Sequence, residues 1–183
     1  MVNRLRRRYL GNIESAISGG FMPHMLTRMV PMAAVIFGLD RISKIYVVEQ
    51  LDLRRVGEME VIPPFFNLVM AWNKGVNFGV LNFGDDGRWF LVALSLVIVA
   101  VVLIWTRRGR GWLVPFAVAA IVGGALGNIW DRVTYGAVAD FINMSCCGFR
   151  NPFAFNVADV AIFLGAALLI LFGERRINPV TRD

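Results

Sequence analysis

Two short copies of one pattern carry the residues best suited to chemistry in this chain. One copy runs from Asn128 to Asp131 at the end of an apolar stretch, and the other runs from Asn156 to Asp159 at the start of another. Residues three apart share one face of a helix, so each Asn would lie beside its Asp. Carboxylates next to long hydrophobic runs are costly and usually functional. The repeated pattern predicts two aspartates held at the same depth by antiparallel helices.

An aspartate pair of this kind can hydrolyse a peptide bond. Two carboxyl groups within a few ångströms do not readily ionise together, so one keeps a proton while the other is charged. The charged group can deprotonate an attacking water, and the protonated group can hydrogen-bond to the carbonyl under attack. We expect Asp131 and Asp159 to form this pair, with Asn128 and Asn156 orienting the acids or the scissile amide. The alternative is helix capping, because Asn156 stands where an N-cap is expected.

The other residues that support hydrolysis are few and badly placed. The one histidine, His24, lies in a predicted N-terminal tail, so a Ser-His-Asp site, a Cys-His site and a His-ligated zinc site are not expected. Ser43 and Lys44 are adjacent and would not face each other on a helix. Cys146 and Cys147 are also adjacent, which makes an ordinary disulfide between them awkward. We therefore expect carboxylate chemistry with no metal and no cofactor.

Long apolar runs must position the aspartates. Of the 183 residues, 57% are hydrophobic, compared with roughly 45–50% in soluble proteins, and the mean hydropathy is +0.60. Four runs approach the about 20 residues that a membrane-spanning helix needs: 29–48, 89–105, 112–130 and 157–172. The first run is interrupted by Asp40, Arg41 and Lys44. The predicted fold class is an all-α membrane protein with four transmembrane helices.

The basic residues indicate how this bundle is oriented. The net charge is +6, and arginines gather before the first run, between the second and third, and after the fourth. Cytoplasmic loops carry such an excess of Lys and Arg. We therefore expect a cytoplasmic tail over 1–28, a four-span catalytic domain over 29–173 and a cytoplasmic tail over 174–183. This topology accounts for the charge without binding to nucleic acid.

The same topology places the aspartates at the outer face of the membrane. Asp131 follows Trp112 by 19 positions, which is a rise of roughly 28 Å along a helix and close to the thickness of the hydrocarbon core. Asp159 lies where the chain re-enters the membrane from outside. Residues 61–72 are rich in β-branched and aromatic types, which indicates short strands in an outer loop, and turn-forming residues follow over 73–79 and 84–87.

Further polar and small residues fit a supporting role. Asp40 and Lys44 are four apart, a spacing that pairs opposite charges on a helix. Asp140 lies in a predicted loop and would pair with Arg132 or Arg150. Gly123, Gly124 and Gly127 permit close approach of a neighbouring helix.

These residues resemble those of a known family. The segments 123–132, 135–142 and 155–162 look like the central motifs of the bacterial lipoprotein signal peptidases (signal peptidase II). Residues 40–44 resemble the first motif of that family, and residues 73–79 resemble its outer-loop motif. The resemblance runs in the family's order from about Val30 to Phe172. Asn77 and Val160 depart from it, because many members carry Ala or Ser at the first position and Ser at the second.

The resemblance implies a multi-pass aspartyl endopeptidase of the bacterial plasma (inner) membrane, with both termini cytoplasmic and its active site near the extracytoplasmic face. It would remove the signal peptide from diacylglyceryl prolipoproteins by cutting on the N-terminal side of the lipidated cysteine. The outer loops would form a small β-cradle and a short surface helix. Membrane lipids and globomycin-type inhibitors would bind, and the protein would act as a monomer. Carried over by motif, the catalytic pair is Asp131 and Asp159, and the substrate-binding or supporting residues are Asn128, Asn156, Ala158, Asp40, Lys44, Asn73, Gly75, Arg132 and Asp140.

Two other classes of protein compete with this interpretation. A proton- or cation-coupled transporter also carries charged residues within its helices, but it would need acids near mid-membrane, and this small chain has no detectable inverted repeat. In an assembly factor, the aspartates would only pair with Arg132 and its neighbours. Such a scaffold would tolerate Asp131→Asn with little functional loss.

Overall fold

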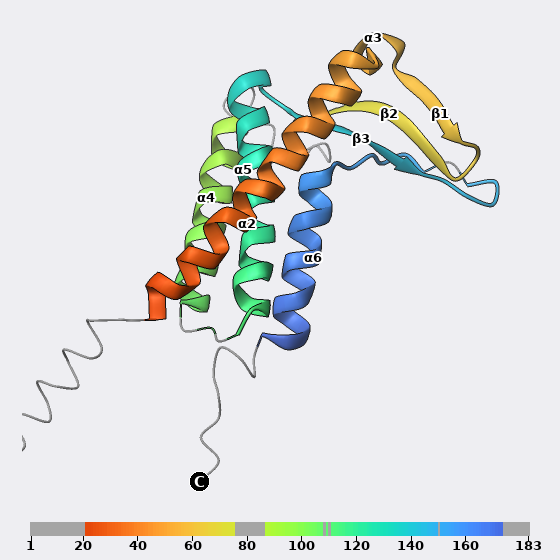
Figure 1. The fold of residues 1–183 in the computed structure, drawn as a ribbon. Helices are drawn as coiled ribbons and strands as arrows, with labels where there is room; N and C mark the ends of the chain where they lie inside the picture. Colours follow the sequence, from red (N-terminus) through yellow and green to blue (C-terminus); the bar gives the residue numbers. More distant parts are fainter. Residues whose placement is uncertain (1–20, 76–86, 108, 110, 150, 174–183) are drawn as a thin grey trace, which may run out of the picture.

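The computed structural model describes residues 21–75, 87–107, 109, 111–149 and 151–173. A bundle of helices stands side by side, and a small sheet projects from one end of it (Figure 1). The elements in chain order are α2 (Phe21–Lys44), η1 (Ile45–Gln50), α3 (Leu53–Val56), β1 (Glu58–Ile62), β2 (Phe66–Asn73), α4 (Gly87–Thr106), α5 (Leu113–Tyr135), β3 (Val138–Met144) and α6 (Val157–Phe172).

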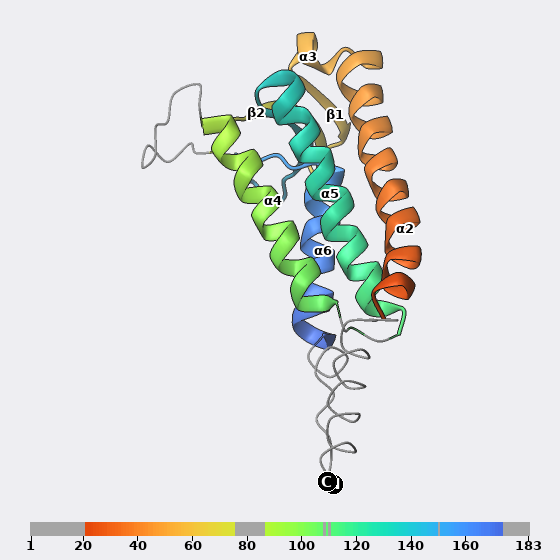
Figure 2. The same ribbon diagram turned by 90° about the vertical axis from the view of Figure 1, so that its left-hand side faces the viewer.

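Helix α5 is the centre of the bundle and packs against α2, α4 and α6 (Figure 2). Its sequence is rich in Ala, Val and Gly, and most of its residues are buried. The glycines act as the sequence predicts. A Cβ on Gly123 would lie 2.6 Å from the carbonyl oxygen of Ala33, and one on Gly124 would lie 2.5 Å from that of Ala158. The backbones of α2 and α6 therefore contact α5 at glycine.

Helix α4 turns an apolar surface outward. Val97, Val101 and Ile104 are all more than half exposed, which is the pattern of a helix facing lipid rather than water. The hydroxyls of Ser95 and Thr106 donate to carbonyl oxygens one turn earlier in the same helix, at 2.8 and 2.6 Å. Their polar groups are therefore satisfied without water.

Two helices among the described residues, α4 and α5, are both long and apolar enough to cross a membrane. Helix α6 is apolar but has only 16 residues, and α2 carries charges in its last turn. The described residues thus form a helical bundle with a small sheet, and a four-span membrane topology remains a proposal.

Helix α2 begins at Phe21, earlier than the predicted start of the first apolar run at residue 29. One stripe of side chains explains the extra turns, because Met25 and Met29 are buried in the core against α5. The Arg28 guanidinium also lies over the Trp112 ring, 4.2 Å from its centroid. At its other end, α2 continues into η1, so the charged residues do not terminate the helix.

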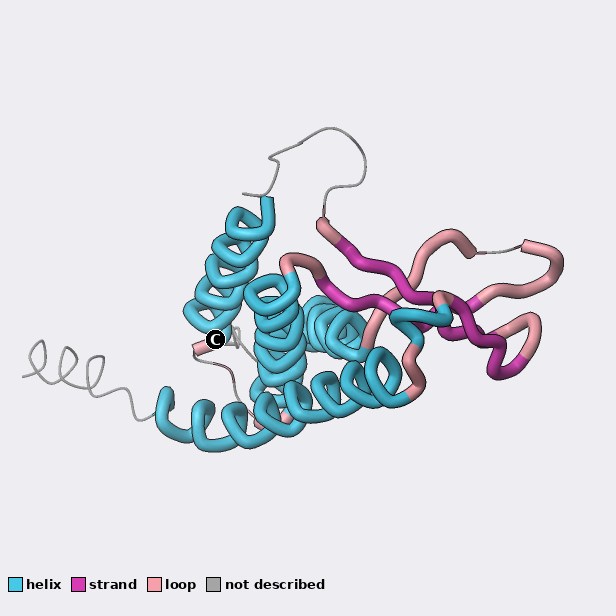
Figure 3. The backbone as a smooth tube through the Cα atoms, turned by 90° about the horizontal axis from the view of Figure 1, so that it is seen from above, coloured by secondary structure: helices cyan, strands magenta, loops and turns pink. Residues whose placement is uncertain are grey.

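The sheet has the order β1-β2-β3, with both pairs antiparallel. Seen from above, it extends to one side of the helices (Figure 3). The predicted strands over 61–72 are confirmed by β1 and β2. The prediction of a loop around Asp140 was wrong, because Asp140 lies in β3 and pairs with Ala71 of β2. A second apolar cluster, formed around Val47, Leu53, Leu68 and Phe141, fixes the sheet to η1 and α3.

Several predictions fall on parts of the chain outside the described residues. These are the turn residues from Val76 to Asp86, Arg150, the cytoplasmic tail over 174–183 and most of the tail over 1–28. Cys146 and Cys147 are described, and both are free and exposed.

Candidate functional site

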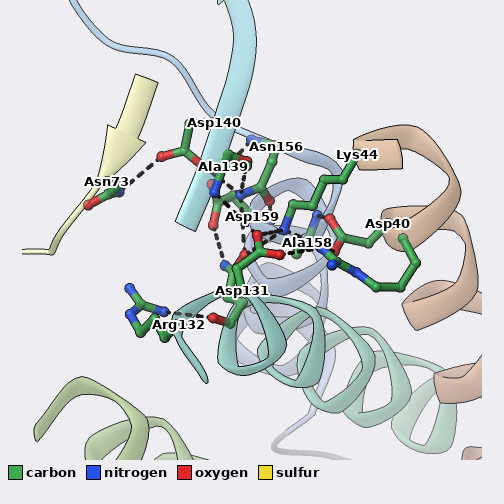
Figure 4. Close-up of polar contacts among 12 residues, drawn as sticks. Asp40, Lys44, Asn73, Asp131, Arg132, Ala139, Asp140, Asn156, Ala158 and Asp159 are labelled. Carbon is green, nitrogen blue, oxygen red and sulfur yellow. Dashed lines mark hydrogen bonds and ion pairs between the residues drawn. The ribbon is translucent and has the colours of Figure 1, made fainter. Parts of the chain in front are cut away.

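A cluster of polar side chains lies where α2, α5 and α6 meet the sheet (Figure 4). The two Asn-x-x-Asp copies meet here. Asn128 Nδ2 donates to Asp159 Oδ1 at 2.8 Å, and Asn156 Nδ2 donates to Asn128 Oδ1 at 3.2 Å. The prediction that both copies reach the same end of the bundle is therefore confirmed.

Asp131 is fully buried, and both of its oxygens are occupied. Arg41 Nη2 lies 2.6 Å from Oδ1, and Lys44 Nζ lies 2.6 Å from Oδ2. The backbone N–H of Ala139 also donates to Oδ2, at 3.2 Å. Two cations and one amide thus balance this carboxylate, which fixes the start of β3 to α5 and α2.

Asp40 is the second fully buried carboxylate of this charge cluster. Its Oδ2 pairs with Lys44 Nζ at 3.0 Å, which confirms the predicted pair, and with Arg41 Nη2 at 3.3 Å. Its Oδ1 accepts from the backbone N–H of Ala158 at 3.0 Å. Asp40 thus connects α2 to the first turn of α6. Breaking such a buried ion pair by removing one partner costs about 3–5 kcal/mol.

The sequence does not predict the role of Arg41, which in the sequence is only one of the charges that interrupt the first apolar run. Because it directly follows Asp40 on a helix, nothing in the spacing indicates that it reaches Asp131, 90 residues further along the chain.

Asn156 is the N-cap of α6, so the capping alternative is correct for this residue. Asn156 Oδ1 accepts from the backbone N–H of Asp159 at 2.9 Å, and Asp159 Oδ2 accepts from the backbone N–H of Asn156 at 3.2 Å. This reciprocal capping box fixes the Asp159 carboxylate on the helix end. Asp159 is partly exposed, unlike the buried Asp131, and its Oδ1 receives only the neutral Asn128 donor described above.

Asp140 reaches the same group from β3. Its Oδ1 accepts from Asn156 Nδ2 at 2.6 Å, and its Oδ2 accepts from Asn73 Nδ2 at 3.0 Å. Burial, and then the negative charge of Asp159, raise the pKa of Asp140 to about 6, although the hydrogen bonds from Asn73 and Asn156 and the charge of Lys44 act in the opposite direction. Asp140 thus shares one asparagine and an electrostatic interaction with Asp159.

These contacts favour Asp140 rather than Asp131 as the acid that works with Asp159. Both oxygens of Asp131 are already held by Arg41, Lys44 and the Ala139 N–H, so neither is free to face a water molecule. A carboxyl group with a raised pKa, close to a second carboxylate, is the arrangement that acid–base hydrolysis needs. Whether Asp140 or Asp131 acts with Asp159 stays a prediction. Cleavage by variants of the two residues distinguishes the two pairs.

The remaining predicted residues support this cluster from its edges. Gly75 donates its backbone N–H to Asn73 Oδ1 at 2.8 Å. It has φ +86°, and a Cβ there would collide with the side chain of Leu91. Arg132 Nη1 donates to the carbonyl oxygen of Asn128 at 3.4 Å rather than forming the predicted ion pair with Asp140. Within the described ranges, no three His, Cys, Asp or Glu side chains are grouped so as to hold a metal ion.

Comparison with known proteins gives consistent results. A family model described as signal peptidase (SPase) II matches residues 32–173. The lipoprotein signal peptidase of Alteromonas mediterranea is 40% identical over 147 residues, covering 79% of each chain. That of Cupriavidus pinatubonensis is 42% identical over 148 residues, covering 80% of this chain and 82% of the relative.

Solved structures are similar as well. A bacterial membrane enzyme solved by the in meso method at 1.9 Å resolution superposes with a TM-score of 0.66 and 27% identity, covering 78% of this chain and 89% of that one. A second bacterial membrane enzyme, solved at 2.3 Å, gives a TM-score of 0.65 at 24% identity and covers 85% and 93% of the two chains. The fold is therefore that of known membrane enzymes.

Proposed function

Because the chain belongs to the signal peptidase II family, we propose that it is an aspartyl endopeptidase that cuts diacylglyceryl prolipoproteins on the N-terminal side of the lipidated cysteine. Membership of the family supports the removal of signal peptides from prolipoproteins. The aspartyl mechanism rests on one observation above all. Asn156 is hydrogen-bonded both to Asp140 and to Asp159. The buried carboxyl group of Asp140 and the partly exposed carboxylate of Asp159 are therefore held in one site.

Each carboxyl has a distinct task in the proposed reaction. Asp159, the more exposed of the two, takes a proton from a water molecule as the water oxygen attacks the scissile carbonyl carbon. Asp140, with its pKa raised to about 6, donates a hydrogen bond to the carbonyl oxygen and stabilises the tetrahedral intermediate. A proton then passes to the leaving amine as the C–N bond breaks. Asn128 fixes the Asp159 oxygen that faces α5.

The arrangement in the membrane follows from the same proposal. The helices hold the site at one end of the bundle, beside the sheet (Figure 1). If both termini are cytoplasmic and four helices span the bacterial plasma membrane, that end lies at the extracytoplasmic face. A diacylglyceryl substrate would keep its lipid in the bilayer and present its scissile bond where water is available. The sheet then serves as the outer cradle.

The proposal is tested with purified wild-type protein and a diacylglyceryl prolipoprotein in a gel-shift assay. Release of the signal peptide, with a new N-terminus at the lipidated cysteine and no inhibition by EDTA, is the expected result. Mass spectrometry of the product identifies the bond that is cut. Absence of cleavage by folded protein would refute the proposed function.

The pH dependence of cleavage should report the state of Asp140. Its carboxyl must be protonated to donate, so kcat/KM should fall as pH rises through about 6. The hydrogen bond from Asn73 stabilises the charged form and so lowers this pKa. Asn73→Ala should therefore move the descending limb of the profile to higher pH, whereas Asn67→Ala on the same strand should leave it in place. An unmoved limb in Asn73→Ala would contradict the role of Asp140.

A further inference from the structure

Three side chains that carry sulfur lie close together in the chain, at the turn that follows β3. They belong to Met144, the last residue of β3, and to Cys146 and Cys147. All three residues are exposed. The turn lies at the end of the sheet that points away from the helices (Figure 1), so these residues stand apart from the candidate site.

The turn brings the two thiols side by side. The backbone N–H of Phe149 donates to the carbonyl oxygen of Cys146 at 2.8 Å, which closes the turn. Cys147 and Gly148 have φ of +59° and +81°, the left-handed values that a tight hairpin turn needs at both central positions. The pKa of the Cys146 thiol is raised, chiefly by a hydrogen bond with the Cys147 thiol. The two sulfur atoms are therefore close enough to share one metal ion.

The alternation of side chains along the strand places the Met144 thioether on the same side as Cys146. Ser145, between them, is buried, and its Oγ donates to Asn143 Oδ1 at 2.9 Å. Successive side chains of an extended strand point to opposite faces. An isolated bridge between Cys146 and Phe149 continues the extended conformation as far as Cys146. Met144 and Cys146 therefore both point away from the buried face of Ser145.

Hydrogen bonds fix the base of this turn. The backbone N–H of Ser145 donates to the carbonyl oxygen of Phe65 at 3.1 Å, and Ser145 Oγ accepts from the backbone N–H of Asn151 at 3.1 Å. Asn143 Nδ2 donates to the carbonyl oxygens of Asn151 and Phe153, at 2.8 Å each. The sulfur atoms thus project from a base that is ordered before any ligand binds, which lowers the entropic cost of binding.

An ordinary disulfide does not compete for these thiols. The chain has two cysteines, so Cys146 and Cys147 have only each other as partners within it. Neighbouring Cα atoms are about 3.8 Å apart across a trans peptide bond, which is less than the about 4.4–6.8 Å of ordinary disulfides. Both thiols are therefore available to a metal ion.

We propose that Cys146 and Cys147, with Met144 as the third ligand, bind one copper(I) ion. Thiolate and thioether sulfur are the soft ligands that Cu(I) prefers, whereas Ca²⁺ and Mg²⁺ need oxygen ligands. Residues 144–149 contain no carboxylate and no imidazole, so a hard cation finds no side-chain ligand in the turn. A structural zinc ion takes four protein ligands, and the turn offers three.

The binding step releases protons. Each thiol loses its proton to the solvent as its sulfur binds the metal, so two protons leave and Cu(I) is held by two thiolates and one thioether. The oxidation state of the ion does not change. This inference goes beyond the proposed function and does not depend on it.

The first experiment is a competition for copper(I) between the purified protein in detergent and the chromogenic chelator bicinchoninate, under argon with ascorbate. The thiols are reduced and counted beforehand. The wild type should take one equivalent of Cu(I) from the chelator and gain the ultraviolet absorption of a thiolate–copper bond. The variant that carries both Cys146→Ser and Cys147→Ser should take none. If the wild type with both thiols reduced takes no more copper than this double variant, the inference is wrong.

The second experiment tests the third ligand. Met144→Leu keeps an apolar side chain of similar size but removes the thioether. It should weaken Cu(I) binding about 10–100-fold, since even the loss of an outer-shell partner has that effect on metal affinity. The matched control is Met59→Leu, because Met59 belongs to β1 of the same sheet and packs against the second apolar cluster. Equal affinities of the wild type and both methionine variants would overturn the three-sulfur site.

The third experiment tests the choice of metal. Wild-type protein loaded with Cu(I) should keep the ion in an excess of Zn²⁺, and displacement of copper by zinc would overturn the proposed selectivity. Melting temperatures show whether each variant is folded. Copper binding is measured without any substrate, so its failure would leave the peptidase assignment intact. Failure to cleave prolipoproteins would in turn leave the copper site intact.

Discussion

Asp140→Asn and Asp159→Asn should each reduce kcat for prolipoprotein cleavage by about 10³-fold or more, because acid–base groups contribute about 10²–10⁴-fold each and members of one catalytic pair act as a unit. An asparagine keeps the size of the side chain and can still accept one of the hydrogen bonds that fix each position. The variants should therefore remain folded. The measurement is single-turnover cleavage in detergent, with the melting temperature of each variant recorded alongside.

Asp131→Asn should behave differently. It removes a negative charge that faces the buried Lys44 and the largely buried Arg41. Leaving buried charge without its partner costs about 3–5 kcal/mol, so we expect a large loss of stability. Cleavage should fall with the folded fraction and through displacement of β3, since the Ala139 N–H depends on this carboxylate.

A double variant distinguishes an anchoring role from a catalytic one. Arg41→Met removes one of the two cations that face Asp131. Combined with Asp131→Asn, it restores the charge balance and should recover much of the lost stability and cleavage. If Asp131 takes part in the chemical step, Arg41→Met cannot restore cleavage to the Asp131→Asn variant. If the double variant is stable but inactive while Asp140→Asn still cleaves, the pair expected from the sequence, Asp131 with Asp159, is the catalytic one.

The sequence contained most of the information needed to locate the site. The Asn-x-x-Asp repeat predicts that Asn128 and Asp159 come together, because both lie at ends of apolar helices that share one face of the membrane. The i, i+4 pair of Asp40 and Lys44 follows from helical spacing alone, and the small residues of α5 indicate close packing. These predictions rest on the spacing of residues along single helices, and the structure confirms them.

Local sequence patterns do not predict the contacts between residues of different helices and strands. The position of Asp140 depends on β3 pairing with β2, which joins segments some 70 residues apart. Asp131 seemed free to react because its cationic partner Arg41 comes from a distant helix. The repeat therefore identified the right end of the bundle and left the choice of the acid paired with Asp159 to the tertiary contacts.

The capping of α6 shows why the structural and catalytic interpretations of a motif need not exclude each other. The hydrogen bonds between Asn156 and Asp159 complete the helix end, and they also leave Asn156 Nδ2 directed at Asp140. A residue that caps the helix therefore also sets the relation between the two carboxyl groups. Its position depends in turn on how closely α6 approaches α5.

Gly124→Ala should lower both stability and activity by forcing these two helices apart. A Cβ at this position would lie 2.5 Å from the carbonyl oxygen of Ala158 and 2.8 Å from Cγ1 of Ile162. Overpacking of this kind costs about 1–3 kcal/mol. The displaced turn of α6 carries Asp159, and a misplacement of about 1 Å at a reacting group can reduce the rate about 10²-fold. Thermal unfolding and single-turnover cleavage measure the two effects.

Two other glycines separate loss of stability from loss of geometry. Gly165 contacts the carbonyl oxygen of Ala117 further along the same helix pair, so Gly165→Ala should destabilise the bundle to a similar extent while the α6 N-terminus, and with it cleavage at low temperature, is less affected. Gly38 has open space around it, and Gly38→Ala should stabilise α2 by up to about 1 kcal/mol through helix propensity. Equal losses of cleavage in the Gly124 and Gly165 variants at matched folded fraction would show that packing alone limits activity. A larger loss in Gly124→Ala would show that close approach of α5 and α6 at Ala158 is what holds the carboxylate of α6 in its working position.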